Sequence, residues 1–110
     1  MSDTKPVAAQ PVMLKELVAY QNAAVVSRTI LDTVMATVTA FAFDENQGLS
    51  EHTTAYDALV VVIEGKVNIR ISGKEFYLEE GQSIIMPANQ PHAVKAVTRF
   101  KMLLVMIRAK

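Results

Sequence analysis

The feature that most constrains the fold of this chain is a series of short apolar runs with period-two alternation. Over residues 34–43 the side chains alternate between a smaller and a larger set. The smaller set is Val34, Ala36, Val38, Ala40 and Ala42, and the larger set is Met35, Thr37, Thr39, Phe41 and Phe43. Successive side chains of a strand point to opposite faces, so this period is typical of a β-strand. We predict a strand over residues 34–43.

Further strand-like runs follow, several of them separated by glycine. They lie within AYDALVVVIEG, KVNIRISG, KEFYLEEG, QSIIMPAN, PHAVKAV and RFKMLLVMI. We interpret Glu64-Gly65 and Ser72-Gly73 as the turns of two tight hairpins, which makes the chain a meander of antiparallel neighbours. About eight short strands at this spacing predict an all-β sandwich or barrel.

The N-terminal part of the chain has a different pattern. Residues 1–12 carry two prolines and several small or polar residues, and we expect a flexible leader there. Met13, Leu14, Leu17 and Val18 then form a stripe with helical spacing, which predicts a short N-terminal helix. Because 110 residues suit one domain, we expect residues 13–110 to form a single barrel domain.

Composition excludes several classes of function. The 11 basic and 11 acidic side chains give a net charge of +0, so the chain lacks the basic character of nucleic-acid-binding proteins. It contains no cysteine, which excludes disulfides, thiolate metal sites and a cysteine nucleophile. The N-terminus does not resemble a signal peptide. The longest apolar runs, 59–63 and 102–107, fall far short of the roughly 20 residues that span a bilayer. We expect a cytoplasmic protein with no nucleic-acid or membrane partner.

Both histidines lie in stretches with the spacing of known motifs. The stretch from Gly48 to Gly65 resembles the first cupin motif, G-x5-H-x-H-x3,4-E-x6-G, when His52 takes the first histidine position. Thr54 and Ala58 then occupy the positions of the second histidine and the glutamate.

The second stretch resembles the second cupin motif, G-x5-P-x-G-x2-H-x3-N. Gly81, Pro87 and His92 match it, whereas Asn89 replaces the glycine and Ala96 replaces the asparagine. Asparagine is among the non-glycine residues that best accept a positive φ, so we expect one at Asn89. The chain therefore resembles the small single-domain cupins, which implies an antiparallel, jelly-roll type of barrel.

The resemblance also implies an internal site. Cupins that bind metal use three histidines and a glutamate, a set suited to iron, manganese, nickel or zinc. His52 and His92 survive here and are our candidate ligands for a divalent metal ion of unknown identity. If so, their ring nitrogens should converge at one end of the barrel, about 3–5 Å apart. The alternative is that each histidine is simply hydrogen-bonded or exposed to solvent.

Other residues near the histidines are weaker candidates. Asp57 has the opposite strand parity to His52 and should face outward unless a bulge intervenes, while Glu51 lies on the preceding loop. We expect Tyr56, Thr54 and Met86 to line a ligand pocket. The alternatives are an exposed loop residue for Tyr56 and core filling for Met86.

Two runs are apolar on both faces. In an antiparallel strand with one solvent-exposed face, apolar and polar side chains should alternate. The two runs are LVVVI at residues 59–63 and MLLVMI at residues 102–107. The short helix would cover one of them, and a second subunit would cover both, so we expect a homodimer.

Three functions fit these features. The first is a small-molecule-binding barrel with an apolar cavity, in which His52, His92 and Tyr56 are the polar groups. It needs no metal, although the two histidines could hold a divalent ion weakly. The second is a metal-dependent enzyme such as an oxygenase or isomerase. The third is a barrel scaffold that acts through its surface. Whether the chain is an enzyme stays open here, because one fold hosts many chemistries.

Overall fold

The structure is a computed structural model that describes residues 7–108, and their regular secondary structure is almost entirely β-strand. The elements in chain order are a single 3-10 turn, η1 (Leu14–Glu16), and the strands β1 (Val25–Asp32), β2 (Ala36–Phe43), β3 (Gly48–His52), β4 (Asp57–Glu64), β5 (Lys66–Ile71), β6 (Lys74–Glu79), β7 (Ser83–Met86), β8 (His92–Ala96) and β9 (Phe100–Ile107). The predicted all-β fold is confirmed.

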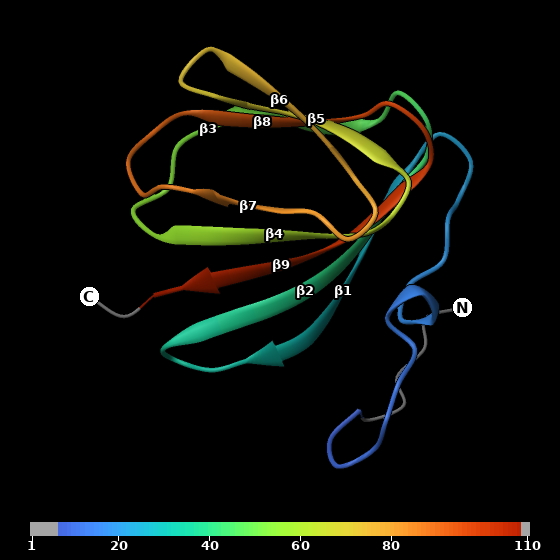
Figure 1. The fold of residues 1–110 in the computed structure, drawn as a ribbon. Coiled ribbons are helices and arrows are strands. Elements are labelled where there is room, and N and C mark those ends of the chain that lie inside the picture. Colours follow the sequence, from blue (N-terminus) through green and yellow to red (C-terminus); the bar gives the residue numbers. More distant parts are fainter. Residues whose placement is uncertain (1–6, 109–110) are drawn as a thin grey trace.

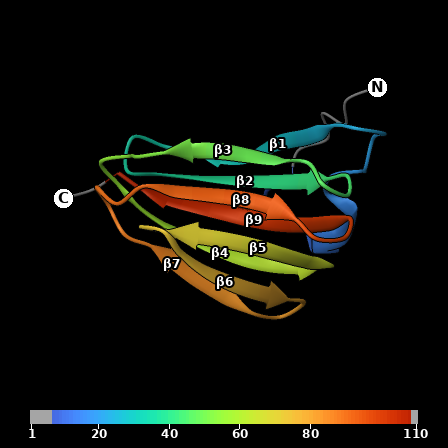
Figure 2. The same cartoon turned by 90° about the horizontal axis from the view of Figure 1, so that it is seen from above.

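The strands form two antiparallel sheets that face each other (Figure 1). The five-stranded sheet has the order β1-β2-β9-β4-β7, and the four-stranded sheet has the order β3-β8-β5-β6. Seen from above, one sheet lies over the other as two stacked layers (Figure 2). Many strands that pair are distant in sequence, as β2 and β9 are, which is the connectivity of a jelly roll.

The core fills the space between the sheets. Along β4 the inward side chains of Ala58, Val60 and Val62 are buried, whereas the residues between them are only half-buried. The neighbouring strands β2 and β9 contribute Phe43 and Phe100, whose rings stack with centroids 4.8 Å apart. Such tight packing stabilises a small domain, because a fully buried large apolar side chain contributes about 1.5–3 kcal/mol.

One of the two predicted hairpins is wrong. Ser72-Gly73 does turn β5 back onto β6, but Gly65 does not pair β4 with β5. β4 pairs with β7 and β9, and β5 pairs with β6 and β8, so the chain passes from one sheet to the other at Gly65. Gly65 has φ +83° and closely approaches the backbone of Arg99. A glycine in the sequence marks a hairpin turn and a crossover between sheets equally well. Here the pairing of β4 with the distant β9 makes Gly65 a crossover.

The N-terminal segment also differs from expectation. The predicted helix is reduced to the 3-10 turn η1, and the segment is anchored by Leu17 and Val18, which pack on Ala40 and Ala42 outside the five-stranded sheet. Residues 1–6 of the predicted leader lie outside the described residues. β1 was missed altogether, and the strand expected from residue 34 begins at Ala36.

No helix within residues 7–108 has the length and apolar character needed to cross a lipid bilayer.

Candidate functional site

The pairing of β3 with β8 brings the two histidines together. His52, the last residue of β3, lies directly opposite His92, the first residue of β8. Their Nε2 atoms are 3.2 Å apart, and their ring centroids are 4.4 Å apart with the planes inclined at 70°. The predicted convergence of the rings is confirmed. Their role as metal ligands stays a prediction.

The other nitrogen of each ring contacts a backbone carbonyl. His52 Nδ1 lies 2.8 Å from the oxygen of Ser50, and His92 Nδ1 lies 3.2 Å from the oxygen of Gln90. A carbonyl oxygen only accepts hydrogen bonds, so these partners assign the proton of each neutral ring to Nδ1. The two Nε2 atoms then face each other with lone pairs. Such an arrangement is repulsive unless a proton or a cation lies between them.

The environment of His92 favours its neutral form. The ring is buried, with 4% of the residue exposed, whereas His52 is exposed. Burial lowers the pKa of His92 below its ordinary value, and the neighbouring His52 lowers it further, against the opposing effect of the hydrogen bond to Gln90. His92 therefore keeps its Nε2 lone pair available near neutral pH, as a metal ligand requires.

The spacing of the Nε2 atoms suits one shared metal ion. With metal–nitrogen bonds of about 2.1 Å, nitrogens 3.2 Å apart subtend about 99° at the metal, between octahedral and tetrahedral angles. Residues 7–108 contain no group of three or more His, Cys, Asp or Glu side chains able to hold a metal ion. Among these residues the structure brings only the two imidazoles together as candidate donors, fewer than the three or four protein ligands usual for a bound zinc ion.

The acidic candidates have other partners. Asp57 Oδ1 accepts a hydrogen bond of 2.8 Å from the backbone N–H of Ala88, which fastens the start of β4 to the loop after β7. Glu51 lies 3.8 Å from Arg70, whose side chain is on the outer side of the four-stranded sheet. Neither carboxylate completes a triad with the histidines.

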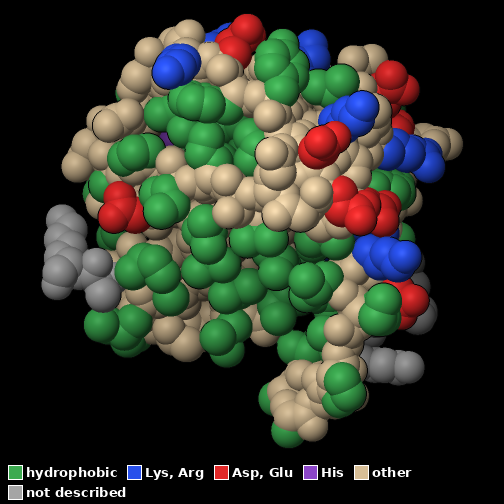
Figure 3. Space-filling model, in the orientation of Figure 1, with side chains coloured by type: hydrophobic (Ala, Val, Ile, Leu, Met, Phe, Trp, Pro, Cys, Tyr) green, Lys and Arg blue, Asp and Glu red, His purple; other side chains and the backbone are tan. Residues whose placement is uncertain are grey.

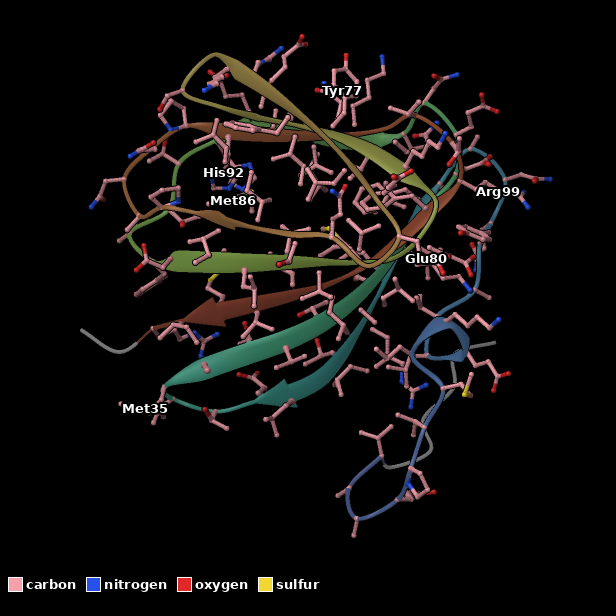
Figure 4. All side chains as sticks on the ribbon, viewed as in Figure 1. Met35, Tyr77, Glu80, Met86, His92 and Arg99 are labelled. Atoms are coloured by element: carbon pink, nitrogen blue, oxygen red, sulfur yellow. The ribbon has the colours of Figure 1, made fainter. Side chains whose placement is uncertain are left out.

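The predicted pocket residues occupy three different settings. Met86, the last residue of β7, is 3% exposed and belongs to the core, and Figure 4 shows it and His92 toward the same end of the space between the sheets. Thr54 is half-buried, and its hydroxyl donates a hydrogen bond of 3.0 Å to the carbonyl oxygen of Tyr56. The backbone of Thr54 also accepts a 2.7 Å hydrogen bond from the N–H of Asn89. Asn89 has φ +65°, which confirms the expected conformation. Thr54 therefore joins the segment between β3 and β4 to the loop after β7, and Tyr56, two residues later, is half-buried.

A hollow lies elsewhere on the molecule, and sequence reasoning missed it. It has a volume of about 650 Å³ on the outer side of the four-stranded sheet, and its lining includes Asn68, Arg70, Tyr77 and Lys95. Asn68 alternates with buried Val67 and Ile69, a pattern that predicts an outward side chain but not a hollow. The hollow forms only because β8, β5 and β6 are neighbours.

The comparison with known proteins agrees with this geometry. Residues 41–108, more than half of the chain, match the family described as the cupin domain. This chain belongs to the cupin family. No curated protein matches it.

Solved cupin-like structures support the assignment. A conserved protein of unknown function from Streptococcus pyogenes is 32% identical, with a TM-score of 0.90 over 100% of this chain and 97% of that chain. A cupin 2 conserved barrel domain protein from Leptotrichia buccalis is 35% identical, with a TM-score of 0.83 over 86% of this chain and 46% of that chain. A cupin superfamily protein from Desulfitobacterium hafniense is 23% identical, with a TM-score of 0.86 over 90% of this chain and 91% of that chain, and it shares the fold.

This cupin departs from the family motif at two of the four ligand positions. Ala58 stands at the glutamate position and is buried against Met86 in the neighbouring strand, and Thr54 stands at the second histidine position. The half of the ligand set that survives comes from two paired strands, which explains why its geometry is intact.

Proposed function

We propose that this cupin is a small-molecule-binding barrel in which His52 and His92 hold one divalent metal ion weakly. Water or an oxygen donor of a small organic ligand takes the remaining positions of the ion. The observation that carries the proposal is that the two Nε2 atoms lie 3.2 Å apart while both Nδ1 atoms lie against backbone carbonyl oxygens. A divalent ion between the rings would replace their repulsion with two coordinate bonds.

The setting of the two rings supports a role in binding. His52 is exposed and His92 is buried, so the pair runs from the surface into the barrel. Met86, a buried core residue, lies toward the same end of the space between the sheets as His92 in the view of Figure 4 and would supply an apolar group there. A few polar groups against an apolar wall is the usual composition of a small-ligand site.

Calorimetric titration of chelator-treated protein without a histidine tag tests the metal site. We expect Mn²⁺, Ni²⁺ or Zn²⁺ to bind with a stoichiometry of about one, with His52→Ala and His92→Gln each weakening binding at least about tenfold. Glutamine fills most of the buried space of His92, and circular dichroism checks that this variant folds. Glu51→Gln and Asp57→Asn are the controls and should bind metal like the unmutated chain. Binding that survives both histidine substitutions, or no binding at millimolar metal, would overturn the proposal.

Water-proton relaxation of the Mn²⁺-loaded protein tests the open positions. Two protein ligands leave several positions for exchangeable water, so the relaxation enhancement should be large. Oxalate, a bidentate oxygen donor, should displace water and reduce it. An enhancement that oxalate leaves unchanged would mean that the metal positions are closed to small ligands.

A further inference from the structure

The hollow on the outer side of the four-stranded sheet is crossed by a row of polar side chains. The register places Lys95, Asn68 and Tyr77 next to one another, from β8 through β5 to β6. All three line the hollow, whose volume is about 650 Å³. Small residues such as Ser50 and Ala93 also line it, so the longer side chains stand around an open floor.

The charged side chains that line the hollow balance each other. Arg70 and Lys95 are basic, whereas Glu51 and Glu75 are acidic. Glu51 lies 3.8 Å from Arg70, and Glu75 is the register partner of Arg70 on β6. Figure 3 shows basic and acidic side chains interspersed along the upper margin of the molecule, where the four-stranded sheet lies. The hollow therefore does not attract ions of one sign by its net charge, and it offers both hydrogen-bond donors and acceptors.

Asn68, in the middle of the row, has an unsatisfied amide group. Its Nδ2 atom is buried and has no hydrogen-bond partner among the residues that the structure describes. A buried donor without an acceptor lowers stability, and an apolar side chain of similar shape would avoid this cost. The strand does not need a polar residue at this position, since β-branched and aromatic side chains favour strands.

Tyr77 places an aromatic ring at the edge of the hollow. It is 69% exposed, and Figure 4 shows it on the side of the four-stranded sheet that faces away from the five-stranded sheet. A second hollow of about 360 Å³ adjoins the first, because Tyr77 and Val97 line both. The ring therefore stands between two neighbouring recesses of the same surface.

We propose that the two adjoining hollows bind neighbouring units of an uncharged oligosaccharide. Sugar hydroxyl groups both donate and accept hydrogen bonds, which matches a lining of mixed donors and acceptors with balanced charges. One sugar oxygen accepts the hydrogen bond that Asn68 Nδ2 lacks. The last torsion of an asparagine side chain has a broad energy profile, so the amide group can turn Nδ2 toward the ligand.

Tyr77 supplies the apolar part of this recognition. The face of an aromatic ring carries partial negative charge, and the weakly positive C–H groups on one face of a pyranose ring pack against it. Both volumes also lie within the range of about 300–1,000 Å³ that is usual for small-ligand sites. The proposal does not depend on the metal site, because the hollows lie on the outer side of the sheet and the histidine pair is not part of their lining.

Titration of the isotope-labelled full chain, followed by nitrogen–proton NMR, is the first test. The probes are maltose, cellobiose, lactose, xylobiose and diacetylchitobiose, each compared with the methyl glycoside of one of its sugars. We expect at least one disaccharide to shift the side-chain amide signal of Asn68 and the backbone signals of Tyr77 and Lys95. Its dissociation constant should be millimolar or lower, and at least about tenfold below that of the methyl glycoside.

Inorganic phosphate is the competing probe in this titration. Shifts caused by phosphate and by no disaccharide would make the hollow an anion site and overturn the proposal, as would the absence of any shift. A disaccharide that binds no more tightly than its methyl glycoside would overturn the claim that both hollows take part. A soluble polysaccharide of the best-bound unit then shows whether the site accepts the interior of a long chain or only a free oligosaccharide.

Two substitutions test the roles of the ring and the amide. Tyr77→Ala should weaken sugar binding at least about tenfold. Met35→Ala is its matched control, because Met35 is 57% exposed and lies far from Tyr77 in Figure 4. Asn68→Leu should weaken binding by at least the same factor and yet raise the melting temperature by about 4–8 °C, because it removes an unsatisfied donor.

This combination distinguishes a binding role of Asn68 from a structural one. If the amide served the fold, Asn68→Leu would lower the melting temperature or fail to fold, and either result would overturn its proposed role. Sugar binding that is unchanged in both Tyr77→Ala and Asn68→Leu would overturn the proposed site altogether.

Discussion

Asp44 shows how a side chain at the surface fixes local structure. Its carboxylate accepts hydrogen bonds from the N–H groups of Ala23 at 2.6 Å and Glu45 at 2.9 Å, and from Arg99 at 2.9 Å. These bonds hold the segment before β1 against the end of β2. Chiefly through the bond from Ala23, and then through Arg99, they lower the pKa of Asp44 from 3.8 to about 2.

This shift predicts the pH range in which Asp44 contributes to stability. A carboxyl group whose pKa is lower in the folded state contributes fully above its unfolded pKa and loses that contribution as pH falls through its folded pKa. The difference in free energy of unfolding between the unmutated chain and Asp44→Asn should be constant above about pH 4 and shrink toward about pH 2. Urea denaturation measures it. Carbon NMR showing Asp44 titrating near pH 4 would contradict the prediction.

The histidine pair shows which features of the site the sequence predicted and which it did not. The motif spacing placed His52 and His92 as a pair, and the structure brings their Nε2 atoms to 3.2 Å. The tautomers were not predictable, because they depend on the carbonyl groups of Ser50 and Gln90. Those carbonyls take their positions only when the two strands pair.

At the scale of elements, the passage from β4 to β5 is the point at which the chain changes sheets. A Cβ atom at Gly65 would lie 2.0 Å from the backbone oxygen of Arg99, and φ there is +83°. Gly73 turns β5 into β6 with the same φ of +83°, yet a Cβ atom there would meet nothing within 4 Å. The two glycines share a conformation and differ in their surroundings.

Alanine substitutions at Gly65 and Gly73 separate the cost of an unfavourable φ from the cost of a steric clash. Gly73→Ala should lower the free energy of unfolding by about 1–2 kcal/mol, because alanine disfavours positive φ. Gly65→Ala should cost about 1–3 kcal/mol more, because backbone next to the buried Phe100 must move as well. Chemical denaturation of both variants measures the difference. Equal losses would mean that the crossover yields to the added methyl group.

The elements also show why some were harder to predict than others. β2 alternates without interruption, so its pattern was clear from the sequence. β1 was missed because a register shift between Thr29 and Leu31 interrupts its alternation and because it is an edge strand with polar exposed positions.

At the scale of the whole molecule, the barrel is held together by its apolar core. Phe43, Phe100 and Met102 are fully buried between the sheets, and they belong to one continuous cluster. The histidine pair lies at the ends of β3 and β8, and of the two only His92 is buried. Folding should therefore depend little on a metal at the proposed site.

Removal of metal tests this independence. Treatment with a chelator should lower the free energy of unfolding by less than about 1 kcal/mol, because an ion at a concentration near its dissociation constant stabilises a protein by less than that. At fixed protein concentration the melting temperature should fall by less than about 4–8 °C. Differential scanning calorimetry before and after chelation measures the shift. A larger fall that a divalent ion reverses would instead indicate a structural metal.

The sequence by itself indicated the all-β class, the cupin family and the pairing of His52 with His92, because period-two alternation and motif spacing are local or fixed-distance signals. Only the tertiary structure decided that Gly65 joins two sheets, that Lys101 is buried under the N-terminal segment and that a hollow lies over Asn68. Each of these depends on partners far along the chain, as Lys101 depends on Lys15 and Tyr20. Local patterns set which face of a strand is apolar, and the distant contacts made on folding decide what covers that face.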